Sequence, residues 1–247
     1  MFEYNGIDKL MKQLLLSFDT STPKGNVALV SDTGIMGEIG LDVKHRPHSD
    51  YLLRHAQFLL QESGVTLADL AGLCVVNGPG SFTGLRVGLA TVQGLAQSLD
   101  LPVYQLSSLL VLGFMYGKAP CAQYCLLDAR KRELYGALLQ WNAKGPHVEQ
   151  MFVLPPSSIC EHINTCHGSD TVLLIGHGAE LYRELFLREC KADLYFGGAA
   201  SCLPTAACAA QLLLRWPDLF PPVQVHEIQA LYVRPSDAEL QRRKKAV

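Results

Sequence analysis

The turn from Gly78 to Arg86, which reads GPGSFTGLR, has the clearest chemical potential in the sequence. A glycine-rich turn between a strand and a helix is a common phosphate site, because backbone N–H groups at the helix start face the anion. This turn has neither the Gly-Lys-Ser/Thr ending of a P-loop nor the glycine spacing of a dinucleotide loop. The helix start could hold an anion, but it lacks the lysine and the magnesium-binding hydroxyl of a P-loop.

Other candidate nucleophiles and ligands are equally incomplete. Ser81 follows Gly80 but does not have the Gly-x-Ser-x-Gly spacing of a hydrolase nucleophile. His45, His48 and His55 lie close together in the sequence, without an acidic residue at ligand spacing. We interpret these histidines as incidental surface groups. The sequence therefore predicts no catalytic residue, no metal site and no cofactor.

The composition limits the possible classes of function. The 247 residues suffice for two modest domains, and 49% hydrophobic against 18% charged residues suits a chain with an obligate interface. A net charge of −2 gives no electrostatic case for nucleic-acid binding by this chain alone. We find no membrane-spanning run and no signal peptide, so a cytoplasmic protein is expected. Eight cysteines without a Cys-x-x-Cys pair predict reduced core thiols rather than disulfides or zinc ligands.

Apolar runs and turn residues predict an alternation of strands and helices in the first half of the chain. Three strands in a meander precede an amphipathic helix, a buried strand and a helix that Ser81 or Thr83 caps. A short strand and a helix that starts at Ser107 follow. The expected ranges are strands 14–18, 27–31, 35–41, 73–76 and 103–105 and helices 49–62 and 84–99.

The same order of elements recurs from residue 124, and an Asp ends the first strand of each pass, at Asp19 and Asp128. We expect strands at 124–127, 133–141, 151–154 and 172–175 and near Leu194, with helices after the run 155–157, up to Glu189 and over 205–215. This repetition predicts an α/β, actin-like (ASKHA) fold with two duplicated ββαβαβα-type domains. The predicted units are 11–106, 107–222 and a tail, 223–247, that packs back toward the first domain.

An active actin-like ATPase places glycines and small hydroxyl side chains after both Asp-bearing strands. The first turn, 19–25, keeps hydroxyls, whereas the second, 128–132, has no glycine and carries three long basic side chains. Tight binding of magnesium-ATP by this chain alone is therefore not expected.

The central helix, 84–99, is apolar nearly all round. Between Leu85 and Ala96 its only strongly polar residues are Arg86, Thr91 and Gln93, so more than one side must be covered. We expect a bulky stripe at 85, 89, 92 and 96 to pack on the chain's own sheet. A small-residue stripe at 84, 88 and 91 would then face a partner. In the alternative, the chain's own elements fill both sides.

These segments together resemble the TsaB (YeaZ) family over essentially the whole chain after Met11. The resemblance is carried by 19–21, 48–49, 77–88, 128–130, 133–135 and 231–234. The departures are a ten-residue extension, Arg54-His55 and a longer basic tail.

The resemblance implies a bacterial cytoplasmic protein that is needed for N6-threonylcarbamoyladenosine in tRNA. It also implies an actin-like subunit without its own catalytic site, which pairs with the catalytic subunit TsaD and is joined by the ATPase TsaE. The pairing uses two long helices from each chain as a four-helix bundle, and the same surface can form a homodimer in isolation. Contact with tRNA would occur only through the complex.

We therefore predict a partner surface on the first two long helices. Its expected members are Tyr51, His55, Phe58, Ser81, Phe82, Thr83, Gly84, Arg86, Val87, Gly88 and Thr91. Two alternatives stay open: a stand-alone actin-fold ATPase or kinase, and a glycoprotease-like peptidase. A third is a nucleotide site shared across the heterodimer, for which Arg86 is a candidate.

Overall fold

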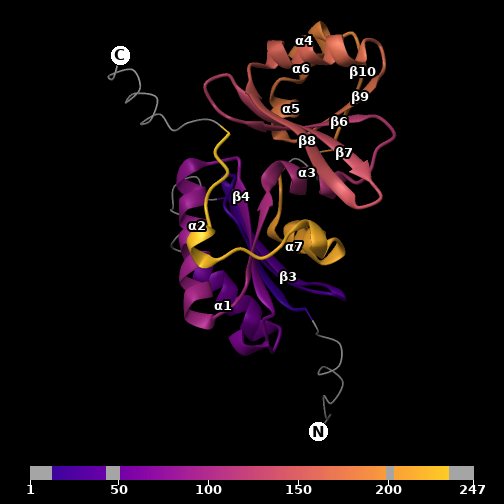
Figure 1. Cartoon of the computed structure of the whole chain (residues 1–247). Helices are drawn as coiled ribbons and strands as arrows, with labels where there is room; N and C mark the ends of the chain where they lie inside the picture. Colours follow the sequence, from indigo (N-terminus) through magenta and orange to yellow (C-terminus); the bar gives the residue numbers. More distant parts are fainter. Residues whose placement is uncertain (1–12, 43–50, 199–202, 234–247) are drawn as a thin grey trace.

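Two five-stranded mixed sheets, with helices between them and on their outer faces, form the molecule (Figure 1). The computed structural model describes residues 13–42, 51–198 and 203–233. The predictions for residues 1–10, for His45, His48 and Ser49, and for the basic end lie outside the described residues.

The first sheet has the strand order β3-β2-β1-β4-β5. Its central strand β1 pairs antiparallel with β2 and parallel with β4. The strands are β1 (Leu15–Asp19), β2 (Lys24–Ser31), β3 (Gly34–Asp42), β4 (Gly72–Gly78) and β5 (Val103–Ser107). All five residues of β1 are buried, since helices cover both faces of this sheet.

The second sheet repeats this order with the next five strands, as β8-β7-β6-β9-β10. Its central strand β6 pairs antiparallel with β7 and parallel with β9, as β1 does in the first sheet. The strands are β6 (Ala122–Asp128), β7 (Leu134–Asn142), β8 (Gly145–Leu154), β9 (Thr171–Ile175) and β10 (Asp193–Phe196). The predicted duplication is confirmed, and the fold is the α/β, actin-like one.

The helices form three layers around the two sheets (Figure 1). Helices α1 (Leu52–Glu62) and α2 (Phe82–Leu99) cover the outer face of the first sheet. Helices α4 (Pro156–His167), α5 (His177–Leu181) and α6 (Arg183–Glu189) cover the outer face of the second. The middle layer holds α3 (Ser108–Tyr116) and α7 (Ala206–Arg215).

The two middle helices are exchanged between the sheets. Helix α3 directly follows the first sheet in the chain but packs on β6 and β7 of the second. Helix α7 follows the second sheet but packs on β1, β2 and β4 of the first. Both helices contribute to one apolar core that runs between the sheets, and this core joins the two halves of the chain.

Two details of the predicted elements are corrected. The single helix expected up to Glu189 is divided at Tyr182 into α5 and α6. Leu53, whose apolar character and spacing in the expected amphipathic helix 49–62 group it with Leu52, Ala56, Leu59 and Leu60, is 53% exposed, whereas those four are buried. Among the described residues, no helix is both long and apolar enough to cross a membrane.

Candidate functional site

The turn before α2 is fixed against the loop that follows β1. The backbone N–H of Ser81 donates to the carbonyl of Ser21 at 2.7 Å, and the Ser81 side chain caps the helix by accepting from the Gly84 N–H at 3.3 Å. Gly80 has to be a glycine here, because a Cβ would overlap the Ser21 carbonyl. The start of α2 is therefore held against the loop that follows the central strand β1.

Close contact with Thr20 decides which side of α2 is buried. The Thr20 hydroxyl donates to the Gly84 carbonyl at 2.8 Å, and a Cβ at Gly88 would collide with the same hydroxyl oxygen. Gly84 and Gly88 are both buried in this contact. The prediction that they face a partner was wrong, because a loop of this chain uses the space that they leave. The bulky stripe of Leu85, Leu89, Val92 and Ala96 is buried, as expected.

The exposed face of α2 is small and nearly uncharged. Arg86 is the only charged residue in the helix. A Cβ at Gly94 would meet no atom within 4 Å, so nothing in the described chain covers this point. The exposed or half-exposed members of this face are Thr83, Val87, Ala90, Thr91, Gly94, Gln97 and Ser98.

Helix α1, which packs beside α2, carries two exposed apolar side chains. Phe58 is 52% exposed, as predicted, and Leu53 is exposed to a similar extent. Tyr51, by contrast, is 4% exposed within the outer core of the first sheet, so its prediction as a surface residue was wrong. His55 is half-buried, and the centroid of its ring lies 5.0 Å from that of the Tyr51 ring. The pKa of its imidazole is lowered, mainly by burial and also by the charge of Arg54.

The segment from 223 to 233 runs along α2 (Figure 1). Gln93 donates to the Ile228 carbonyl at 3.1 Å, and the Leu231 N–H donates to the Asn77 carbonyl at 2.8 Å. At the helix start, the Arg86 guanidinium lies 3.8 Å above the Phe82 ring, which contacts the ring of Tyr232. This segment covers one flank of α2 and leaves the small face open.

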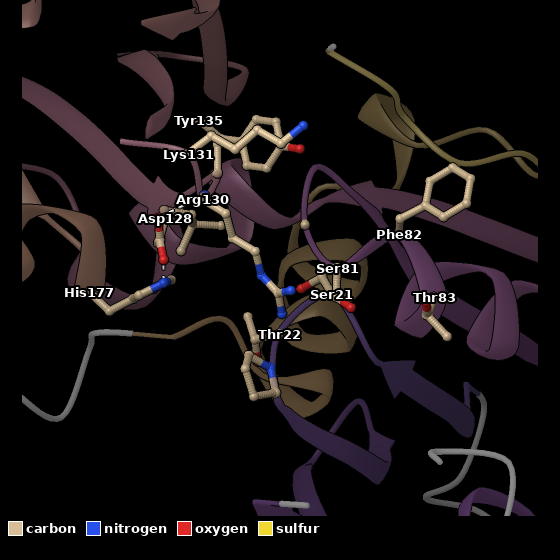
Figure 2. A pocket seen from close by; sticks show the side chains of 14 residues that line it. Ser21, Thr22, Ser81, Phe82, Thr83, Asp128, Arg130, Lys131, Tyr135 and His177 are labelled. Carbon is tan, nitrogen blue, oxygen red and sulfur yellow. Dashed lines mark hydrogen bonds between the residues drawn. The ribbon is translucent and has the colours of Figure 1, made fainter. Parts of the chain in front are cut away.

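A cleft of about 620 Å³ opens between the start of α2 and the turn after β6 (Figure 2). Arg130 extends across it toward Ser21 and Ser81. On the far side the Asp128 N–H donates to Nε2 of His177 at 3.2 Å. The lining residues are Ser21, Thr22, Pro23, Gly80, Ser81, Phe82, Thr83, Leu127, Asp128, Ala129, Arg130, Lys131, Tyr135 and His177.

The charges of this cleft suit an anion better than a metal-bound nucleotide. Arg130 and Lys131 are both exposed, and both have left-handed backbone conformations. They stand in the turn after β6, where a phosphate-binding turn would have glycines. Asp128 is the only carboxylate among the lining residues, and its Oδ1 already accepts from the Arg130 N–H at 2.8 Å. Within the described ranges, no three His, Cys, Asp or Glu side chains are grouped to hold a metal ion.

Asp19, two residues before Ser21 of the cleft, is fully buried. Its Oδ1 accepts from the Ser21 N–H at 2.8 Å, while Oδ2 has no hydrogen-bond partner among the described residues. Burial raises the pKa of Asp19 to about 7, although hydrogen bonding with Ser21 acts to lower this pKa. A carboxyl group that is largely protonated below neutral pH is a poor cation ligand.

Sequence reasoning missed part of this surface. Ala90 and Gly94 belong to the exposed face of α2, and Leu53 is exposed on α1. Helical periodicity alone could have proposed the face through Thr83, Ala90 and Gly94. It could not choose between this face and the one through Gly84 and Gly88, since both consist of small residues.

Comparison with curated proteins finds relatives that share one name in several bacteria. The chain is 31% identical over 175 residues to tRNA threonylcarbamoyladenosine biosynthesis protein TsaB of Escherichia coli. The match covers 69% of this chain and 74% of that protein. It is 28% identical over 172 residues to the Bacillus subtilis protein of the same name, with the same coverage.

The structural comparison extends over more of the chain. YeaZ from Pseudomonas aeruginosa superposes with a TM-score of 0.73 at 28% identity, covering 89% of this chain and 99% of that one. The family model of TsaD, tRNA N6-adenosine threonylcarbamoyltransferase, matches residues 39–146. The E. coli relative and the superposed structure together show that this chain belongs to the TsaB (YeaZ) family.

Proposed function

We propose that this chain is a non-catalytic scaffold in the biosynthesis of N6-threonylcarbamoyladenosine in tRNA and that it binds the catalytic subunit TsaD through α1 and α2. Membership of the TsaB family supports the pathway. The observation that carries the scaffold role is the exposed face of α2, which is small, nearly uncharged and uncovered at Gly94.

The composition of this face favours another helix as its partner. Small side chains let two helix axes approach closely, so that ridges and grooves interlock. Exposed Leu53 and Phe58 on the neighbouring α1 supply apolar surface that a partner would remove from water. A tRNA backbone would instead require a cluster of cationic side chains, and Arg86 is the one cation of α2.

The nature of the partner follows from the family likeness. The TsaD family model matches residues 39–146, a range that includes both α1 and α2. A TsaD chain would therefore present related helices, and two such pairs would form a four-helix bundle. A second copy of this chain could use the same surface in the absence of TsaD, giving a homodimer. The ATPase TsaE and tRNA would join through the complex.

The test is an arginine at the uncovered point. Gly94→Arg should fold, because the new side chain extends into solvent, and should abolish co-purification with co-expressed TsaD. Leu187→Arg, at an exposed helical position on α6, is the matched control and should keep the complex. Gly88→Arg is unsuitable as a probe, since it would clash with Thr20. Retention of TsaD by Gly94→Arg, with an unchanged elution volume, would contradict the proposed interface.

The cleft favours a second candidate, a nucleotide-binding enzyme that acts alone. Arg130, Lys131 and the start of α2 could face a phosphate group. Against it, the Asp19 carboxyl group is buried, and the Asp128 carboxylate already accepts at Oδ1 from the Arg130 N–H, so neither is a ready ligand for magnesium. Calorimetry with magnesium-ATP on the purified chain distinguishes the two, and micromolar binding would favour the enzyme.

A peptidase is the remaining alternative. Its candidate nucleophile, Ser81, already uses its hydroxyl oxygen as the cap of α2. Hydrolysis of a peptide by the purified chain, lost in Ser81→Ala, would be needed to support this activity.

A further inference from the structure

Helix α4 holds the end of α6 through a single asparagine. The Asn164 side chain donates from Nδ2 to the Glu189 carbonyl at 2.9 Å and accepts at Oδ1 from the Lys191 N–H at 2.6 Å. These two bonds lie on either side of Cys190 in the sequence. The backbone at Cys190 is therefore fixed against α4.

Cys160 lies on the same face of α4, one turn before Asn164. Its side chain is 2% exposed in the outer core of the second sheet, and Cys190 packs against this core from a half-buried position. The Asn164 bonds hold residue 190 against the face of α4 that carries Cys160, and both cysteines belong to the same apolar cluster. Two reduced cysteines, one on α4 and one directly after α6, thus lie near each other where the backbone is held on both sides.

We propose that Cys190 and Cys160 form a peroxide-sensitive dithiol, in which Cys190 is the site of oxidation and Cys160 is the resolving thiol. The arrangement is independent of the partner surface, because it lies in the second half of the chain.

The surroundings give the two sulfur atoms different roles. The neighbouring Cys160 thiol lowers the pKa of the Cys190 thiol, although burial and the nearby Glu189 oppose this effect. The neighbouring Cys190 thiol and burial raise the pKa of Cys160. The thiolate is the nucleophilic form, so the half-exposed Cys190 reacts first with an oxidant from solvent. Buried Cys160 is then in contact with the oxidised sulfur.

The reaction balances with one hydroperoxide. The Cys190 thiolate attacks the terminal peroxide oxygen, so that an S–O bond forms, the O–O bond breaks and the alkoxide or hydroxide takes a proton. The Cys160 sulfur then attacks the sulfenic sulfur, an S–S bond forms, and the leaving hydroxide takes the Cys160 proton as water. In sum, two thiols and ROOH give a disulfide, ROH and water. The disulfide would link α4 covalently to the end of α6.

Other cysteines provide the comparison. Burial raises the pKa values of Cys74 and Cys125 to about 12, so both should stay inert. Cys166 is exposed on α4, with its sulfur 3.8 Å from the His162 ring nitrogens. Its oxidation therefore provides a reference rate for an exposed thiol on the same helix as Cys160.

The experiment treats the full, reduced chain with a small excess of hydrogen peroxide and maps tryptic peptides without reduction. Trypsin releases Cys190 in the peptide 189–191, whereas Cys160 and Cys166 share the peptide 145–183. We expect these peptides to be joined with a loss of about 2 Da, and joined equally in the control variant Cys166→Ser. In Cys160→Ala, dimedone should trap a sulfenic acid at Cys190, and in Cys190→Ser, Cys160 should stay reduced.

Two results would overturn the proposal. One is a wild-type chain in which Cys190 is oxidised no faster than Cys166. The other is a linkage that disappears in Cys166→Ser. As a further arm, Asn164→Ala should slow disulfide formation severalfold relative to oxidation of Cys166, because the Cys190 backbone is no longer held, and an unchanged ratio would count against the geometry. These measurements use the isolated chain, so a failure of TsaD binding would not affect them.

Discussion

The Thr20 hydroxyl lies against Gly88 so closely that no side chain fits between them, and it donates to the Gly84 carbonyl one turn earlier. Through this contact the loop after the central strand β1 sets the rotation of α2. The rotation decides which small residues of the helix are buried and which are left for a partner.

Two glycines of α2 should respond to alanine in opposite directions. Gly88→Ala should lower the free energy of unfolding by about 1–3 kcal/mol, because the methyl group collides with Thr20. Gly94→Ala should raise it by up to about 1 kcal/mol, since its Cβ meets nothing and alanine favours the helix. Urea denaturation measures both. In a Thr20→Ala background the Gly88→Ala loss should shrink, and an unchanged loss would place the strain elsewhere.

Asp19 should make stability depend on pH. Its pKa is about 7 in the folded chain and near 3.8 when unfolded, so between these values the folded chain keeps a proton that the unfolded chain has released. The free energy of unfolding therefore falls as pH rises through this window, by up to about 4 kcal/mol. Asp19→Asn, which still accepts from the Ser21 N–H, should flatten the profile between pH 5 and pH 8. Parallel profiles for the two proteins would contradict the raised pKa.

The segment along α2 should contribute unevenly to stability. Ile228 is buried in the outer core of the first sheet, so Ile228→Ala should cost about 2–4 kcal/mol. Tyr232 is about half exposed, and Tyr232→Ala should cost less than about 1 kcal/mol. Thermal or urea unfolding gives both values. Equal losses would mean that the aromatic contact with Phe82 anchors the segment.

A side chain of the first sheet should anchor the helix donated by the second half. Asn26 is buried, and its Oδ1 accepts from the Ala206 N–H at the start of α7. Asn26→Ala leaves this N–H without its partner and should cost about 1–3 kcal/mol. Asn142→Ala, in an exposed turn where the side chain accepts from the Lys144 N–H, is the control and should cost less. A loss no larger than that of the control would show that the apolar core alone positions α7.

The sequence predicted the elements well and their contacts less well. Turn residues and apolar runs located the strands of both sheets, and the two Asp-bearing strands indicated the duplication. These signals are local, so they could be read without knowing the fold. The division of α5 from α6 at Tyr182 was missed, because no proline or glycine marks it.

The partner surface needed information from distant residues. Gly84 and Gly88 look like a docking stripe until Thr20, more than sixty positions earlier, is found in the space beside them. Tyr51 looked exposed because the periodicity of α1 does not include the neighbouring strands that bury it. Phe58, Phe82, Thr83 and Arg86 are exposed as predicted, since their positions depend on helix geometry alone.

The reciprocal exchange of α3 and α7 has a consequence for dissecting the molecule. A cut in the connection between α3 and β6 would leave each fragment with an apolar sheet face whose covering helix belongs to the other fragment. Neither fragment should therefore fold alone. The two halves of the intact chain should unfold in one transition, and separated fragments should refold only when they are mixed.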